Sequence, residues 1–72
     1  MRTAKDIGAS LRKLRGDTPR ETVADAVGVT YSAMAMYEAG ERVPRDEIKA
    51  ALAKYFGTSV GSLFFGEEVH GS

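Results

Sequence analysis

The chain has 72 residues, with ten basic and ten acidic side chains and no cysteine, so it forms one domain without disulfides or thiolate metal sites. Its formal net charge of zero speaks against a strongly electrostatic partner, although leaving out residues 67–72 leaves ten basic against eight acidic groups. No apolar run has the length of a signal peptide or of a membrane span, which predicts a cytoplasmic protein of a bacterium or phage, with no membrane partner.

The first predicted helix covers residues 4–15. Ile7, Leu11 and Leu14 recur at steps of four and three residues, which is the spacing of one apolar helix face. The pattern breaks at Gly16. This spacing predicts an amphipathic helix that buries all three aliphatic side chains and ends before a short loop.

The second predicted helix begins near Pro19. Thr18 and Glu21 have the spacing of a capping box, with proline at the first helical position. Gly28 follows the last apolar position and can adopt the left-handed conformation that ends helices. The sequence therefore predicts a short helix between the proline and the glycine.

Three further helices follow, and glycines or caps mark their ends. They are predicted over residues 31–39, about 45–56, and 60–64. The fourth helix is expected to place four apolar side chains along one face: Ile48, Leu52, Tyr55 and Phe56. Because no strand pattern interrupts the helices, the predicted fold class is all-α with five short helices. Residues 1–66 are expected to form the domain and residues 67–72 a flexible polar tail.

The second and third helices have the features of a pair that crosses steeply. Ala24 supplies a small side chain where the helices meet, and Gly28 permits a positive φ in the three-residue turn between them. Thr30 can cap the third helix. Apolar residues suited to fill the wedge between the two helices are Val23, Val27, Val29, Met34 and Tyr37.

This region resembles the Cro and phage-repressor type of helix-turn-helix regulators, also called the xenobiotic-response-element family. Its most specific element is the string Tyr37-Glu38-x-Gly40-x-Arg42-x-Pro44, and the resemblance extends over roughly residues 7–65. Members of this family are compact, lambda-repressor-like five-helix domains that bind operator DNA, usually as dimers, and mostly repress transcription. The resemblance implies a sequence-specific regulator that represses by occupying its operator.

The resemblance also implies roles for individual residues. The third helix, residues 31–39, would lie in the major groove of double-stranded DNA and present Tyr31, Ser32, Ala35 and Met36. Phosphate contacts would come from Arg20, Thr30 and Arg42, with Arg20 also able to reach a base edge. Arg15 would pair with Glu38 inside the domain. The segment from Val60 to Phe65, including Phe64, is the candidate contact of a homodimer.

A second hypothesis is a protein-interaction module on the same fold, partner to another regulator, with little or no DNA binding. The neutral charge and the side chains of Tyr31, Ala35 and Met36 favour it, since bidentate base contacts need long polar groups. An enzyme is not indicated. Glu21 is explained as a capping residue, and His70 has no cysteine or second histidine beside it. No catalytic residue, metal site, cofactor or small-molecule ligand is predicted.

Overall fold

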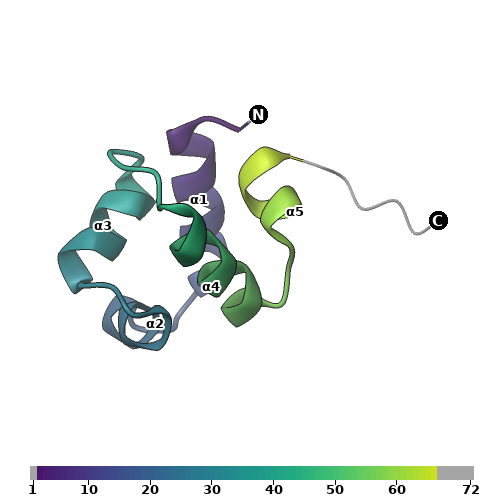
Figure 1. Ribbon diagram of the computed structural model, residues 1–72. Helices are drawn as coiled ribbons and strands as arrows, with labels where there is room; N and C mark the ends of the chain where they lie inside the picture. Colours follow the sequence, from purple (N-terminus) through teal and green to yellow (C-terminus); the bar gives the residue numbers. More distant parts are fainter. Residues whose placement is uncertain (1, 67–72) are drawn as a thin grey trace.

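The computed structural model describes residues 2–66, which form five helices and no strand (Figure 1). The helices are α1 (Ala4–Arg15), α2 (Arg20–Val27), α3 (Tyr31–Ala39), α4 (Asp46–Phe56) and α5 (Val60–Phe65). This architecture confirms the predicted all-α, five-helix fold. The predicted polar tail, residues 67–72, lies outside the described residues. Among the described helices, none combines the length and the apolar character that a membrane crossing requires.

The start of α2 differs from its prediction. The helix begins at Arg20, and Pro19 occupies the N-cap position without a side-chain hydrogen bond, so the predicted capping box of Thr18 and Glu21 is wrong. Thr18 belongs to the turn after α1: its N–H donates to the Arg15 carbonyl at 3.0 Å, and its own carbonyl accepts from Arg15 Nη1 at 2.9 Å. These bonds hold Thr18 against the end of α1.

A capping box does form at α1, where Thr3 and Asp6 exchange two hydrogen bonds. At the other helix ends, glycines with positive φ terminate α2, α3 and α4 as predicted. The hydroxyl groups of Thr30 and Ser59 cap α3 and α5. The residues at the ends of α2, α3 and α4 are local in sequence, which is why these ends could be predicted, whereas the capping box of α1 was not predicted.

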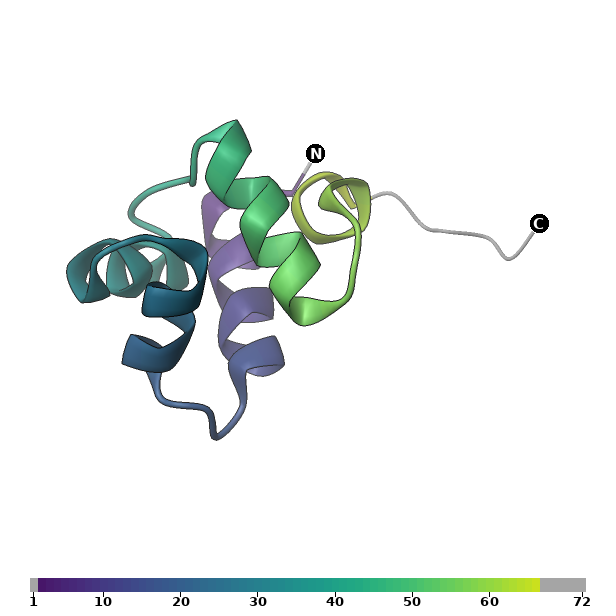
Figure 2. The same ribbon diagram turned by 60° about the horizontal axis from the view of Figure 1, so that its bottom comes forward.

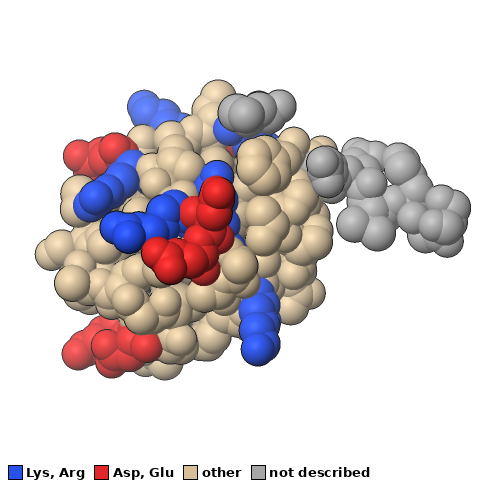
Figure 3. Space-filling view, in the orientation of Figure 1, with Lys and Arg blue, Asp and Glu red and all other residues tan. Residues whose placement is uncertain are grey.

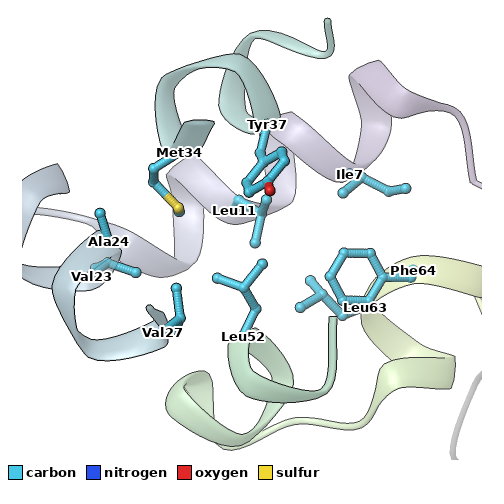
Figure 4. Close-up of a cluster of buried hydrophobic side chains, with 10 residues drawn as sticks. All are labelled: Ile7, Leu11, Val23, Ala24, Val27, Met34, Tyr37, Leu52, Leu63 and Phe64. Carbon is cyan, nitrogen blue, oxygen red and sulfur yellow. The ribbon is translucent and has the colours of Figure 1, made fainter. Parts of the chain in front are cut away.

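The core draws buried side chains from all five helices (Figure 4). It contains Ile7, Leu11, Val23, Ala24, Val27, Met34, Tyr37, Leu52, Leu63 and Phe64. Met34 and Tyr37, predicted as core residues, are 0% and 6% exposed. Removing any of these large side chains would cost about 2–5 kcal/mol in transfer and cavity terms.

Two predicted core positions are wrong. Leu14 is 44% exposed and Tyr55 is 43% exposed. Figures 1 and 2 place α5 beside the N-terminal half of α1, so α5 does not cover Leu14 near the other end. In α4, Leu52 and Phe56 lie one turn apart and face inward, which turns Tyr55 towards solvent.

α1 crosses the end of α3 at very short range, and two glycines permit this approach. A Cβ atom added to Gly8 would lie 2.5 Å from the carbonyl oxygen of Glu38. One added to Gly40, where φ is +75°, would lie 2.8 Å from the Cα of Lys5. The backbone of Glu38 is thereby held directly against α1, with no side chain between the two helices at this point.

Candidate functional site

α2, a short turn and α3 form one unit at the edge of the molecule opposite α5 (Figures 1 and 2). Gly28 ends α2 with φ +79°, and the N–H of Val29 then donates to the Ala24 carbonyl at 2.9 Å. The hydroxyl of Thr30 accepts from the N–H of Ala33 at 3.0 Å and starts α3. Ala24 is 1% exposed, so a small side chain occupies the contact where the sequence predicted one.

α3 has one buried and one accessible side. Of the four side chains predicted to face a groove, Tyr31 and Ser32 are exposed, and Ala35 and Met36 are partly exposed. Ala35 and Met36 line a shallow pocket together with Arg12, Arg20 and Glu41. The accessible side of α3 therefore combines a tyrosine, a hydroxyl and a small apolar surface, and arginines from α1 and α2 flank it.

A buried carboxylate lies behind this surface. The side chain of Glu38 is 1% exposed, and its two oxygens accept from Arg15 Nε at 2.7 Å and from Arg15 Nη2 at 2.9 Å. This hydrogen-bonded pairing raises the pKa of the Arg15 guanidinium above its ordinary value. The two residues whose pairing the family resemblance implied are thus brought together across 23 positions of sequence.

Arg20 also contacts this carboxylate. Its Nε donates to Glu38 Oε1 at 3.1 Å, and its Nη1 donates to the hydroxyl of Tyr31 at 3.2 Å. The guanidinium carbon lies 5.4 Å from the centroid of the Tyr31 ring, within cation–π range. Sequence reasoning missed this cluster. Contacts between the first residues of two different helices leave no periodic signal.

A second polar region lies beside the turn between α2 and α3. The structure brings Thr30 and Arg42, two predicted phosphate contacts, to one groove of about 550 Å³. The loop after α3 and the start of α4 supply the opposite wall, which includes Arg45 and Glu47. Arg42 and Arg45 are both exposed. Two arginines thus stand at the rim of a groove beside α3, and one of them, Arg45, is paired with Glu47 at 3.4 Å.

The candidate dimer segment is only partly accessible. Phe64 is 1% exposed and closes the core, whereas Phe65 is 38% exposed and Val60 is partly buried. The ammonium of Lys49 lies 5.0 Å from the centroid of the Phe65 ring. Burial of Phe64 inside the monomer removes it from the predicted contact, which narrows to Val60 and Phe65.

Charges on the described surface are mixed. In Figure 3, lysine and arginine side chains lie among aspartates and glutamates on the face shown, and no single basic patch covers it. Within residues 2–66, no three His, Cys, Asp or Glu side chains gather where they could hold a metal ion. The site offers hydrogen-bonding groups and a small apolar surface, with arginines at its border.

This chain is similar to known helix-turn-helix proteins. A family model described as "Helix-turn-helix" matches residues 9–63. The solved structure of the P22 c2 repressor in complex with a synthetic operator is 25% identical, with a TM-score of 0.80, over 93% of this chain and 100% of that one. A structure of the clp gene regulator ClgR from Corynebacterium glutamicum is also 25% identical, with a TM-score of 0.76, over 86% of this chain and 68% of that one. No curated protein matches.

Proposed function

Because the chain belongs to the helix-turn-helix family, we propose that it is a DNA-binding transcriptional regulator that inserts α3 into the major groove of its operator. The observation that carries this proposal is the position of α3 at the edge of the molecule, with Tyr31, Ser32, Ala35 and Met36 accessible. An α-helix fits the width of the major groove, where base pairs present distinct patterns of donors, acceptors and methyl groups.

The flanking groups suit a duplex. Thr30 and Arg42 line the groove beside α3, where they would contact the phosphates of one strand. The first N–H groups of α2 add an anion-binding helix terminus on the other side of the turn. These contacts would fix the orientation of α3, and the side chains of α3 would supply the sequence preference.

The similarity to the P22 c2 repressor, solved with a synthetic operator, supports repression by occupancy. A homodimer would present two copies of α3 to successive major grooves, so the operator would have two-fold symmetry with half-site centres about 34 Å apart. In the segment assigned to this contact, Phe65 is exposed and Val60 is partly exposed. The proposal includes no catalysis and places the protein in the bacterial cytoplasm, where its DNA partner is.

Nuclease protection of DNA from around the protein's own gene tests this function. We expect one protected, two-fold symmetric site, and we expect Arg42→Ala to weaken protection. Lys54→Ala, which changes an exposed cation of α4, is the matched control and should protect like the unchanged protein. Absence of any protected site up to tens of micromolar protein would contradict the proposal.

One observation favours a second candidate, a protein-interaction module. Ala35 and Met36 form part of a shallow pocket, and α3 offers no long amide or basic side chain for bidentate base contacts. In that case α3 would dock on another regulator. Binding to a partner protein that DNA fragments do not compete for would favour this candidate over the first.

A further inference from the structure

We propose that Arg20 and Tyr31 act together as one donor unit that selects guanine in the major groove, and that Glu38 is a positioning residue for this unit. This inference rests on the proposed DNA-binding function and assigns it a base preference. It begins from three side chains that the structure links in a row: the buried carboxylate of Glu38, the guanidinium of Arg20 and the phenol of Tyr31.

Glu38 provides a fixed anchor at the inner end of the row. Its side chain is 1% exposed, and its backbone is pressed against α1 at Gly8. Arg15 occupies both carboxylate oxygens from the other side. A carboxylate held in this way cannot turn towards solvent, so any guanidinium bound to it takes a defined direction.

Arg20 connects Glu38 to the surface of the molecule. Its Nε and Nη2 both lie 3.1 Å from Glu38 Oε1, which turns that edge of the guanidinium inward. Nη1 donates to the Tyr31 hydroxyl at 3.2 Å, and the guanidinium carbon lies 5.4 Å from the centroid of the Tyr31 ring. These contacts engage three of the five N–H groups of the arginine, which leaves one N–H on Nη1 and one on Nη2 for an outside acceptor.

Tyr31 completes the unit at the accessible end. Its side chain is exposed, and the residue keeps 54% of its surface. Because the phenol oxygen accepts from Arg20, its own O–H hydrogen points elsewhere and is available to donate. The outer face of the pair therefore offers N–H and O–H donors side by side at the beginning of α2 and α3.

Two adjacent donors match one base edge. In the major groove guanine presents two acceptors, N7 and O6, whereas adenine presents an acceptor beside a donor and cytosine presents a donor. Adenine or cytosine would place an N–H group against the N–H and O–H groups of the pair. The pair therefore favours a G·C base pair at the position that it reaches in each half-site.

The test starts from a library of randomised duplex DNA. The unchanged protein should enrich a site with guanine at one fixed position in each half. Tyr31→Phe should lower the preference for that guanine roughly five-fold, the effect of one lost hydrogen bond, and should keep the other preferences. Tyr55→Phe makes the same chemical change at an exposed tyrosine of α4 and should enrich the original site.

The enriched duplex then tests Glu38. Replacing the selected guanine by 7-deazaguanine, which lacks the N7 acceptor, should weaken binding of the unchanged protein roughly five-fold and leave Tyr31→Phe less affected. Glu38→Gln should lose the guanine preference with Tyr31 still present, and it should also lose the hydrogen-bonded NMR signal of the Arg20 Nε–H. Circular dichroism establishes that this variant is folded. If it is not, Arg20→Lys, which keeps the charge but cannot keep the side-on contact to Glu38, replaces it in the measurement of guanine preference only, because lysine has no guanidinium Nε–H.

The possible outcomes distinguish a failure of the proposed function from a failure of the guanine preference. If the unchanged protein enriches no sequence, the proposed function is overturned and this inference with it. If it enriches a site but Tyr31→Phe and Glu38→Gln keep the same guanine preference, the inference is overturned and the function stands. If Glu38→Gln instead weakens binding equally to all sequences, Arg20 contacts a phosphate, and the inference is likewise overturned.

Discussion

Glu38 is the residue on which the interior polar contacts of this small domain converge. A carboxylate that is 1% exposed is destabilising unless it is paired and hydrogen-bonded. Here two arginines from α1 and from the start of α2 supply the partners, while both remain partly open to solvent. The arrangement joins three helices through one ionised group, and removal of a partner is costly because the charge stays buried.

Arg15→Lys tests the importance of the bidentate geometry. An ammonium cannot reproduce the two parallel N–H···O bonds to Glu38, so we expect the free energy of unfolding to fall by about 1–2 kcal/mol. Because the pKa of Arg15 is raised, its contribution is complete at lower pH and is lost only as pH rises through that raised value. Urea denaturation at neutral pH therefore records it in full. Arg12→Lys, at an exposed position of the same helix, should leave the midpoint unchanged, and equal midpoints for the two variants would contradict this assignment.

At the scale of helices, the close crossing of α1 and α3 decides how the site is presented. Gly8 and Gly40 leave no room for a Cβ atom at the crossing, so the backbones themselves are in contact. This contact fixes the end of α3, where Glu38 lies, against α1. The accessible edge of α3 consequently has one orientation relative to the rest of the domain.

Gly40→Ala and Gly28→Ala separate this contact from backbone strain. Both glycines have φ between +75° and +79°, so alanine costs about 1–2 kcal/mol at either position. A Cβ at Gly28 meets nothing within 4 Å, whereas one at Gly40 meets the backbone of Lys5 at 2.8 Å. Gly40→Ala should therefore lose about 1–3 kcal/mol more than Gly28→Ala. Equal losses in thermal and urea unfolding would show that the crossing is not tight.

Helix ends could be predicted from the sequence because they depend on single residues. Gly28, Gly40 and Gly57 terminate helices through conformations that other residues rarely adopt. The predicted cap at Thr18 was wrong because Arg15, which is bound to Glu38, also donates a hydrogen bond to the Thr18 carbonyl. The pairing of Arg15 with Glu38, which sets this position of the guanidinium, joins residues 23 positions apart, and local spacing contains no information about it.

In the site as well, features that depend on local sequence could be predicted, and contacts between helices could not. The accessible positions of α3 follow from helical periodicity and from the family resemblance. The contact of Arg20 with Glu38 and Tyr31 follows only from how α2 and α3 cross. Gly8 was overlooked for a related reason: glycine inside a helix signals a close approach, but the sequence does not identify the partner backbone.

Over the whole molecule, the neutral charge limits how DNA binding can work. Ten basic and ten acidic side chains, interspersed on the face in Figure 3, do not create a broad attractive field. Affinity must then come from a few local contacts beside α3. Arg42 and Arg45, both exposed at one groove, are the cations placed to make them.

We expect the affinity for DNA to depend moderately on salt concentration, because only a few cations contact phosphates. If these two arginines of each subunit of a dimer contact phosphates, raising salt from 50 to 200 mM should weaken binding on the order of 100-fold. Fluorescence anisotropy with a labelled operator measures the slope. Arg42→Ala should make it shallower by about two, one contact per subunit, and Lys54→Ala should not change it. Affinity independent of salt would contradict phosphate contacts.

In the proposed complex, α3 and its flanks form the surface that meets DNA. Amide chemical-shift changes in ¹⁵N-labelled protein, recorded while the selected duplex is added, test it most directly. We expect the largest changes at the start of α2, along the accessible side of α3 and in the loop before α4. Changes confined to α4 and α5, with α3 unaffected, would contradict it.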